Sequence, residues 1–599
     1  VAGMMLTFRE VERSGLGYDI VDDLTGKKMG RASSATFRTA DVVGLDTMAH
    51  VIKTLQNGAK DDPFNSCFAN PVALDKLLAL GNFGQKTKAG FFKKEGKTIL
   101  QFNAETGEYV PAGAKADKEV TDILRKPAAE RVKALRESAH PQAQFIWALL
   151  RNAFHYAAVT LESIAESARE VDFAMRWGFG MKQGPFEIWQ EAGWKQVAEW
   201  VKADIDSGKA LSKAPLPAWV FDGRDGVHTA EGSWSPKTGK YVPIRDLPVY
   251  KRQAFRENVL GSQAPNAATA GKTLFEDANI RLWTLDDEVV IASIKSKMHT
   301  ISAEVTAGLA KGLEIAEAGY KGMVIWTQDG PFSAGADLQS MMPAFMSGGG
   351  KAIAPFEKQL QDFMLSLRYS NVPTVAAMHG LALGGGCELA VHAAKRVAAM
   401  ETYVGLVEVG VGLIPGGGGL AYLARRAAEQ VEASKGVSGM VGAELMGFVK
   451  EGFQAAAMAK VATSAIEARK FGYLLEGDVV VPNKDEVLYV AIAQAKAMFE
   501  SGYRAPAKKQ FAVAGRNVKA TLQSSLINMR DGGFISQHDY YISSCIADVL
   551  TGGDVDAGTL VSEEYLHALE RKHFCALLDN PKTQERIMGM LSTGKPVRN

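Results

Sequence analysis

The segment Gly380-Leu381-Ala382-Leu383-Gly384-Gly385-Gly386-Cys387-Glu388 is the part of the sequence around which the rest is organised. An apolar run, residues 372–378, leads into it, and residues 386–391 are typical of the opening of a helix. Glycines at such a junction let another group come close to backbone N–H donors. The segment therefore predicts a tight turn that leads into a helix, with a carboxylate, Glu388, in its first turn.

Two further motifs lie on either side of this turn. Upstream, residues 323–327 predict a buried strand, which ends in Phe332-Ser333-Ala334-Gly335-Ala336-Asp337. Downstream, Glu408 lies seven residues before Pro415, the first residue of Pro415-Gly416-Gly417-Gly418-Gly419. One α/β segment thus contains two glycine turns that follow strands and two glutamates.

These three motifs, in this order, resemble those of the crotonase (enoyl-CoA hydratase/isomerase) superfamily over roughly residues 282–482. The resemblance implies an α/β domain of the ββα superhelix type. It also implies that the backbone N–H groups of Ala334 and Gly385 form an oxyanion hole and that Glu388 and Glu408 are the catalytic carboxylates. The substrate-binding positions that it implies are Gly335, Ala336, Asp337, Lys295, Lys297 and Met298.

The chemistry fits these residue types. Attack of water on an enoyl thioester places negative charge on the carbonyl oxygen, and losing one oxyanion N–H donor typically costs about 3–4 kcal/mol of barrier. Water must lose a proton and the α-carbon must gain one, which suits two carboxyl groups. Glu388 would deprotonate water and Glu408 would protonate the α-carbon. The alternative is that the glycine turns are tight loops and the glutamates are solvated.

Two neighbouring stretches have open interpretations. Residues 295–301 occupy the place where the family contacts the adenine end of CoA, so Lys295 and Lys297 are candidate phosphate partners or ordinary surface lysines. His299 is expected to be a pocket or surface residue. Residues 338–371 are predicted as a loop, either a mobile flap over the acyl tail or a surface loop.

The first hundred residues resemble the C-terminal helical domain of 3-hydroxyacyl-CoA dehydrogenases. The matching residues are Val43–Asp46 and the tail Gly84-Gln85-Lys86-Thr87, followed by Gly90-Phe91-Phe92. The family usually has Gly at the position of Lys88 and Pro after the position of Gly30. The resemblance implies an all-α domain.

An internal repeat indicates that this helical domain is duplicated. Each copy is predicted to continue into a helix after the matched glycine, and hairpins are predicted near residues 98–110 and 234–243. The matched pairs are Val21-Asp22 with Val171-Asp172 and Gly30 with Gly180, both 150 residues apart, and Phe37 with Phe186 and Gly44 with Gly193, both 149 apart.

The predicted organisation has five parts. A first helical domain spans residues 1–105, a hairpin and second helical domain 106–250, and a linker 251–275. The crotonase-like domain spans 276–485, and a C-terminal helical region without a catalytic motif spans 486–599. Several domains are expected for 599 residues, because single cores stop growing near 250–300 residues.

Composition excludes several classes of protein. Apolar content of 47% and charged content of 23% are ordinary for a globular protein, and a net charge of +1 argues against a nucleic-acid partner. Four cysteines without a Cys-x-x-Cys motif indicate a reducing compartment and no metal site. No apolar run reaches the roughly 18 residues of a membrane span, and no signal peptide is recognised, so we expect a cytoplasmic protein.

The resemblances together predict a multifunctional enzyme of fatty-acid β-oxidation. The activity expected in this chain is the syn hydration of trans-2-enoyl-CoA to 3-hydroxyacyl-CoA. The alternatives are a Δ3–Δ2 enoyl-CoA isomerase and a catalytically silent scaffold that docks a thiolase subunit. Acyl-CoA is the expected substrate, and a homo-oligomer is expected. Acyl chain length is not predicted.

No cofactor is expected in this chain. NAD is expected only for an additional N-terminal domain that would precede Val1, since no strand followed by Gly-x-Gly-x-x-Gly and a helix is recognised. The chain alone is therefore expected not to oxidise 3-hydroxyacyl-CoA.

Overall fold

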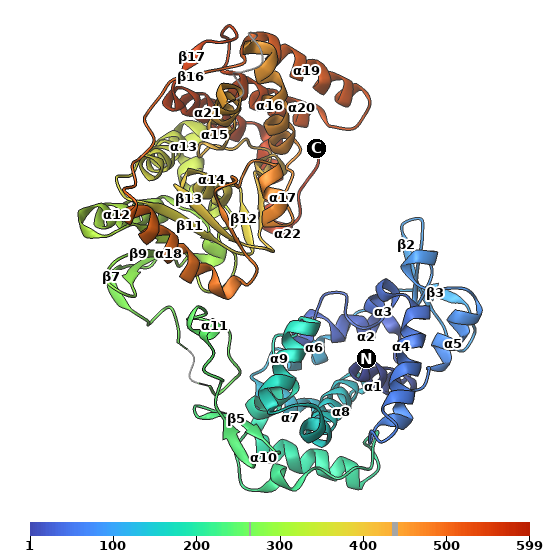
Figure 1. Ribbon diagram of the computed structural model, residues 1–599. Coiled ribbons are helices and arrows are strands. Elements are labelled where there is room, and N and C mark those ends of the chain that lie inside the picture. Colours follow the sequence, from blue (N-terminus) through green and yellow to red (C-terminus); the bar gives the residue numbers. More distant parts are fainter. Residues whose placement is uncertain (263–264, 434–440) are drawn as a thin grey trace. The chain divides into compact units, whose positions relative to one another are not determined.

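The computed structural model describes residues 1–262, 265–433 and 441–599 (Figure 1). The chain forms two compact units: unit 1 comprises Val1–Asp246 and Glu257–Ala264, and unit 2 comprises Leu247–Arg256 and Pro265–Asn599. The segment predicted as a linker therefore contributes residues to both units, and its residues 263–264 lie outside the described part.

Unit 1 is built from helices and two small antiparallel sheets that share one hydrophobic core. Its helices are α1 (Ala2–Ser14), α2 (Tyr18–Thr25), α3 (Phe37–Val43), α4 (Leu45–Gly58), α5 (Val72–Ala79), α6 (Lys118–Leu124), α7 (Ala128–Glu137), α8 (Pro141–Ile164), α9 (Ala168–Phe179) and α10 (Pro185–Asp206). The sheets are β1 (Phe92–Glu95), β2 (Thr98–Phe102) and β3 (Tyr109–Pro111), and β4 (His228–Thr229), β5 (Gly232–Ser235) and β6 (Lys240–Val242). Both predicted hairpins are thus present, each with one additional strand.

Equivalent buried contacts recur in the two copies of the predicted repeat. Asp22 accepts hydrogen bonds from the N–H groups of Thr36 (3.0 Å) and Phe37 (2.7 Å) at the start of α3. Asp172, 150 residues later (172 − 22), accepts from Phe186 (3.0 Å) and Glu187 at the start of α10. In both copies a carboxylate caps a helix N-terminus, where backbone N–H groups have no intrahelical acceptor.

A second pair of contacts also repeats. Asp41 accepts from two consecutive N–H groups at the start of β1, at 2.8 and 2.9 Å. Gln190, 149 residues later (190 − 41), accepts from two consecutive N–H groups at the start of β4 at the same distances. The hydroxyl groups of Tyr109 and Tyr241 likewise donate to the carbonyls of Gly90 (2.6 Å) and Gly226 (2.8 Å). In both copies, therefore, the corresponding helix, α3 or α10, holds the hairpin in the same way.

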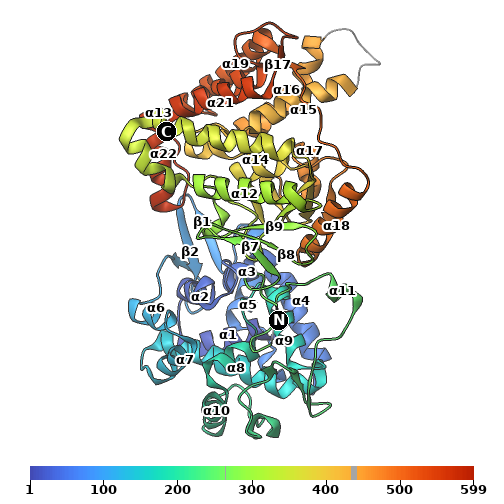
Figure 2. The same cartoon turned by 90° about the vertical axis from the view of Figure 1, so that its left-hand side faces the viewer.

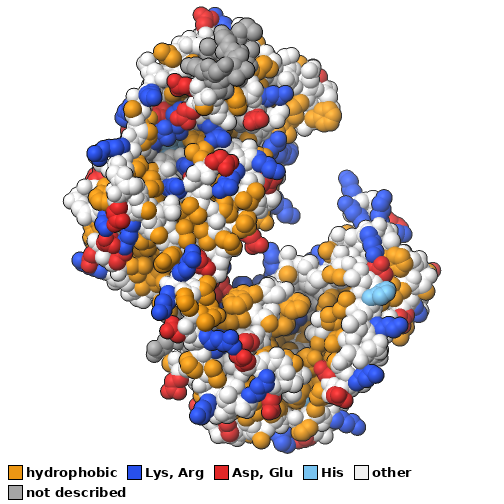
Figure 3. Space-filling model, in the orientation of Figure 1, with side chains coloured by type: hydrophobic (Ala, Val, Ile, Leu, Met, Phe, Trp, Pro, Cys, Tyr) orange, Lys and Arg blue, Asp and Glu red, His pale blue; other side chains and the backbone are white. Residues whose placement is uncertain are grey.

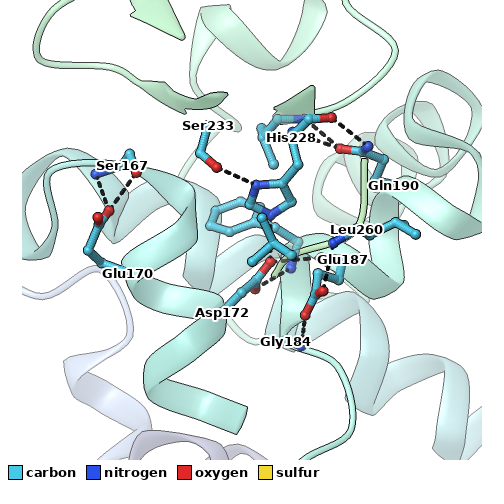
Figure 4. Close-up of polar contacts among 12 residues, drawn as sticks. Ser167, Glu170, Asp172, Gly184, Glu187, Gln190, His228, Ser233 and Leu260 are labelled. Carbon is cyan, nitrogen blue, oxygen red and sulfur yellow. Dashed lines mark hydrogen bonds and ion pairs between the residues drawn. The ribbon is translucent and has the colours of Figure 1, made fainter. Parts of the chain in front are cut away.

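The second copy adds a polar network that the first copy lacks (Figure 4). His228 Nε2 lies 2.7 Å from Asp172 Oδ2, and His228 Nδ1 lies 2.9 Å from Ser233 Oγ. This is the order of a Ser-His-Asp triad. However, these side chains are at most 2% exposed, so no substrate reaches the serine. We therefore assign the network to the attachment of β4 and β5 to α9.

Unit 2 contains a seven-stranded sheet in the order β15-β13-β11-β10-β9-β8-β7. The strands β9, β10, β11, β13 and β15 run parallel, and β7 and β8 are antiparallel at one edge. A separate parallel pair joins β12 to β14. The strands are β7 (Lys272–Glu276), β8 (Ile280–Thr284), β9 (Val290–Ile294), β10 (Met323–Ile325), β11 (Thr374–Met378), β12 (Leu381–Leu383), β13 (Lys395–Ala399), β14 (Tyr403–Gly405) and β15 (Val479–Val481).

Both faces of this sheet are buried, which explains its near-continuous apolar strands. Along β9, Val290 and Ala292 pack into the large core, whereas Ile291 packs into a second core on the opposite face. The helix α18 (Val487–Glu500) covers this second face, where it contacts β10, β11 and β13. The helices α12 (Ala303–Gly319) and α14 (Gly385–His392) lie on the other face (Figures 1 and 2).

The prediction of a loop over residues 338–371 is wrong. The segment forms α13 (Leu338–Arg368), which is interrupted at Gly348 and Gly349, where the backbone leaves helical geometry. Three glycines and two prolines had concealed its periodicity in the sequence. Because α13 packs against α21 (Glu563–Leu578), the C-terminal helices complete the core above the sheet. The other α-helices in the described part of unit 2 are α11 (Pro248–Lys251), α15 (Gly419–Ala433), α16 (Val441–Ala457), α17 (Ala465–Lys470), α19 (Gly515–Asp531), α20 (Gln537–Thr551) and α22 (Pro581–Thr593).

The surface carries charges of both signs. On the face drawn in Figure 3, Lys and Arg side chains lie among Asp and Glu side chains. None of the helices in the described ranges is long and apolar enough to cross a membrane.

Candidate active site

Two turns of the predicted motifs lie side by side. Ser333 donates its N–H to the carbonyl of Leu381 (3.0 Å) and accepts from the N–H of Leu383 (3.1 Å). Gly335 has φ +107°, and a Cβ atom there would lie 2.9 Å from the Leu383 carbonyl and 3.4 Å from the Gly385 nitrogen. Only glycine allows this close approach. The Ala-Gly-Ala-Asp turn thus lies against the N-terminus of α14.

Glu388 is held in the first turn of α14. Its side chain is buried, and Oε1 accepts hydrogen bonds from the N–H groups of Gly417 and Gly419, each at 2.8 Å. Charge-assisted bonds of this kind hold a carboxylate in one orientation. The Pro-Gly-Gly-Gly-Gly motif therefore positions Glu388.

Glu408 reaches the same place from the end of the β14 segment. The N–H of Gly384 donates to the Gly405 carbonyl (2.9 Å), which brings the two segments together. A Cβ atom on Gly384 (φ +53°) would lie 2.9 Å from Glu408 Oε1. Glu408 Oε2 is buried and has no hydrogen-bond partner among the described residues. Glu408 thus lies beside Gly384, close enough to Glu388 for the charge of Glu388 to act on it.

Burial raises the pKa of both carboxyl groups, and the charge of Glu388 adds to the shift of Glu408. Burial raises the pKa of Glu388 to about 7, although its two backbone N–H donors oppose the shift. The pKa of Glu408 is raised well above the usual range, first by burial and then by the charge of Glu388. Near neutral pH this arrangement favours an ionised Glu388 and a protonated Glu408, which is the pairing of one base with one acid.

The two predicted oxyanion donors differ in their surroundings. The N–H of Ala334 donates to the carbonyl of Met298 at 3.1 Å. Gly385 opens α14, so its N–H lies in the first turn, where no intrahelical acceptor exists. A thioester oxygen at this place would meet one donor at a helix N-terminus and one that it must share with Met298.

The other predicted binding residues have mixed positions. Lys295 Nζ pairs with Glu276 (2.8 Å) and with the Asp277 carbonyl (2.6 Å) at the edge of the sheet. Lys297 is exposed, and Met298 is 45% exposed, in a short turn where Met298 has φ +57°. Of these three residues, Met298 is the one whose carbonyl accepts a hydrogen bond from the predicted oxyanion turn, from the N–H of Ala334.

The end of the Ala-Gly-Ala-Asp motif has a structural role. Asp337 caps α13 by accepting from the N–H of Ser340 (3.1 Å). Ala336 pairs with Ile301 in a parallel bridge. These contacts hold the turn in place.

Three polar side chains near Glu388 had no motif to mark them. Glu357 lies on α13, in the segment predicted as a loop, and His567 and Glu570 lie on α21, in the region predicted to lack chemistry. Each is buried. Among the described residues, no group of three or more His, Cys, Asp and Glu side chains is arranged to hold a metal ion.

Comparison with known proteins identifies both parts of the chain. Residues 288–437 match the family model of enoyl-CoA hydratase/isomerase, and residues 2–94 match that of the 3-hydroxyacyl-CoA dehydrogenase C-terminal domain. The fold is therefore a crotonase-like α/β domain together with all-α domains like the C-terminal part of 3-hydroxyacyl-CoA dehydrogenases.

Individual relatives extend this match over the whole chain. A Bacillus subtilis protein named as a 3-hydroxyacyl-CoA dehydrogenase is 34% identical over 100% of this chain and 73% of its own length. A Rickettsia felis protein named as a fatty acid oxidation complex trifunctional enzyme is 24% identical over 98% of this chain and 71% of its own length. Human mitochondrial methylglutaconyl-CoA hydratase is 34% identical over 28% of this chain and 50% of its own length.

The site geometry, the two family models and the full-length relatives agree. The chain belongs to the family of fatty-acid oxidation proteins in which a 3-hydroxyacyl-CoA dehydrogenase C-terminal domain precedes an enoyl-CoA hydratase/isomerase domain.

Proposed function

We propose that unit 2 is an enoyl-CoA hydratase that adds water syn to trans-2-enoyl-CoA and forms 3-hydroxyacyl-CoA. The observation that carries this proposal is that the buried carboxyl group of Glu388 lies close enough to Glu408, whose Oε2 atom is also buried, for its charge to raise the pKa of Glu408. Their raised pKa values suit one base and one acid at neutral pH.

In the proposed mechanism, Glu388 accepts a proton from water as the water oxygen bonds to the β-carbon. The electrons of the double bond move toward the thioester, and the carbonyl oxygen becomes negatively charged. The N–H groups of Ala334 and Gly385 stabilise this oxygen. Glu408 then gives its proton to the α-carbon. In this mechanism both carboxyl groups act on the same face of the double bond, so hydroxyl and proton add to that face.

The bond from Ala334 to the Met298 carbonyl bears on substrate binding. When the thioester oxygen arrives, the Ala334 N–H must either bond both oxygens or release the Met298 carbonyl. Met298 and His299 both have positive φ, at 57° and 52°. Residues other than glycine adopt this region at a cost, so a small change of this turn on binding CoA is energetically accessible.

Two alternatives make different demands on the site. A Δ3–Δ2 isomerase moves one proton and needs one acid–base group, so two positioned carboxyl groups favour the hydratase. A silent scaffold that docks a thiolase subunit needs neither group. Substrate turnover separates these possibilities.

The dehydrogenase-related unit is not assigned a redox step. Within the described part of unit 1 the strands pair antiparallel, whereas a dinucleotide site normally uses parallel strands and a glycine-rich turn. The residues of this unit therefore do not fit NAD. We propose that it serves as a helical domain that supports contacts with the substrate and with a partner.

The proposal is tested by following the loss of enoyl-thioester absorbance when the purified chain meets crotonyl-CoA. Glu388→Gln and Glu408→Gln should each lower turnover by at least about 10²-fold, a typical contribution of a positioned acid–base group. Glu401→Gln changes an exposed carboxylate on the turn before β14 and should leave turnover unchanged. If either site variant turns over normally, that residue is not part of the catalytic pair, and an inactive wild-type chain favours the scaffold.

A further inference from the structure

The turn Gly416–Gly419 is surrounded by ionisable side chains at every residue. A Cβ atom on Gly416 would lie 2.8 Å from Glu357 Oε2, and one on Gly417 would lie 2.9 Å from Glu388 Oε2. One on Gly418 would lie 2.7 Å from His567 Nε2, and one on Gly419 would lie 2.9 Å from Glu388 Oε1. The glycines thus let polar groups from three helices, α13, α14 and α21, meet at one turn.

Several of these groups have no hydrogen-bond partner although they are buried. Glu357 Oε2, Glu408 Oε2, Glu570 Oε2 and His567 Nε2 are among the buried atoms that lack a partner in the described part of the chain. An unsatisfied buried polar group costs about 1–3 kcal/mol. Such groups are usually bonded to ordered water or have a functional role. These four atoms, one of which belongs to Glu408 itself, therefore indicate a function for the group of side chains.

The position of Glu357 is fixed by its helix. One turn further along α13, Gln361 donates to the carbonyls of Gly416 (2.7 Å) and His567 (3.0 Å) and accepts from Arg571. These bonds tie α13 to the glycine turn and to α21. Glu357 is only 5% exposed.

We propose that Glu357 is a proton-transfer residue that resets the site between turnovers, by taking the proton that Glu388 removed from water and returning a proton to Glu408. The inference rests on the proposed hydratase function. It assigns a role to a side chain on α13 that no motif marks.

The number of protons on the three carboxyl groups is the same before and after this reset. Addition of water leaves Glu388 protonated and Glu408 ionised, the reverse of the state that starts the reaction. A protonated Glu357 gives its proton to Glu408, and it then receives the proton that Glu388 holds. The three carboxyl groups carry two protons and one negative charge before and after this reset, so no step requires two ionised carboxylates side by side.

The protonation of Glu357 supports this role. Burial, and then the charge of Glu388, raises the pKa of Glu357 to about 8, and Arg571 opposes the shift. The charge of Glu357 in turn contributes to the raised pKa of Glu408. Glu570 on α21 faces the same cluster, and the charge of Glu388 likewise raises its pKa. At neutral pH Glu357 thus holds a proton and is electrostatically coupled to both catalytic groups.

The experiment compares the first turnover with later turnovers. Each enzyme is mixed with an excess of crotonyl-CoA in a rapid-quench instrument. The enzymes compared are wild type, Glu357→Gln and the control Asp362→Asn, which changes an exposed carboxylate on the same helix. We expect Glu357→Gln to complete one turnover per site at the wild-type rate. Later turnovers should be on the order of tenfold slower, with kcat/KM within about twofold of wild type. Asp362→Asn should match wild type.

A second variant guards against a folding defect. Glu357→Met removes the unsatisfied carboxyl group, so its thermal unfolding midpoint should rise, while its later turnovers should be as slow as those of Glu357→Gln. Equal first and later rates in both variants would overturn the inference, whether those rates are normal or lowered together. If wild type itself does not hydrate crotonyl-CoA, the proposed function has failed, which is a distinguishable outcome.

Discussion

The chemistry of this protein depends on residues whose ordinary behaviour is changed by burial. A glutamate side chain in water loses its proton well below neutral pH. In unit 2, burial raises the pKa of Glu388 to about 7. Its backbone donors at Gly417 and Gly419 oppose this shift, whereas at Glu408 the charge of Glu388 adds to the effect of burial. This difference in environment is what would separate the proposed base from the proposed acid.

This separation predicts the pH dependence of hydration. Protonated Glu388 cannot accept a proton from water, so kcat/KM should fall about tenfold per pH unit as pH drops below the pKa of Glu388, near 7. The measurement is initial rate against pH, at low crotonyl-CoA concentration. The residual activity of Glu388→Gln should lack this acid limb. A rate that is flat from about pH 5 to 8 would mean that Glu388 is not the base.

The sequence identified the residues at the Gly384–Gly385 turn but not their whole environment. The resemblance of their motifs to the crotonase superfamily implied that Glu388, Glu408, Ala334 and Gly385 converge; their spacing in the sequence alone would not have shown it. Glu357 could not be predicted, because its role depends on the packing of α13 against α21, which are about 200 residues apart. The contact of Ala334 with Met298 was also invisible, since it depends on the conformation of one turn.

At the scale of elements, the helices and strands of strong periodicity were predictable and the interrupted ones were not. The strands β8 and β9 and the helices after residue 482 follow clear patterns. In contrast, α13 contains Pro343, Pro355 and the break at Gly348 and Gly349, which hid its 3.6-residue period. The duplication in unit 1 was visible because buried capping residues keep their spacing.

The network of His228 predicts a stability effect in unit 1. Replacing His228 by Ala leaves Asp172, which is fully buried, without one of its partners. Breaking a buried pair in this way typically costs about 3–5 kcal/mol. Chemical denaturation of the His228→Ala variant should show this loss in the free energy of unfolding. The control His50→Ala, at an exposed position of α4, should change it by less than about 0.5 kcal/mol. A loss as small as that of the control would show that the pair adds nothing to stability.

At the scale of the whole molecule, two units of different ancestry lie in one chain. The residues assigned to the proposed hydration lie in unit 2, and part of unit 1 matches the 3-hydroxyacyl-CoA dehydrogenase C-terminal domain. We therefore expect this chain to hydrate enoyl-CoA but not to carry out the 3-hydroxyacyl-CoA dehydrogenase reaction for which its Bacillus subtilis relative is named.

Purified chain should give no NADH above background from 3-hydroxybutyryl-CoA and NAD, although it hydrates crotonyl-CoA. The reason is that hydride transfer requires a bound dinucleotide, and the sequence offers no strand followed by Gly-x-Gly-x-x-Gly and a helix. The measurement is NADH fluorescence, with a complete 3-hydroxyacyl-CoA dehydrogenase as the positive control. Enzymatic formation of NADH would show that a dinucleotide site is present and unrecognised.

The central claim is that Glu388 and Glu408 deliver hydroxyl and proton to one face of the double bond. It is tested most directly by hydrating crotonyl-CoA in D₂O and analysing the 3-hydroxybutyryl-CoA product by NMR. The account predicts a single deuterium at the α-carbon, on the same face as the new hydroxyl group. A deuterium on the opposite face, deuterium on both faces, or no hydrated product would contradict it.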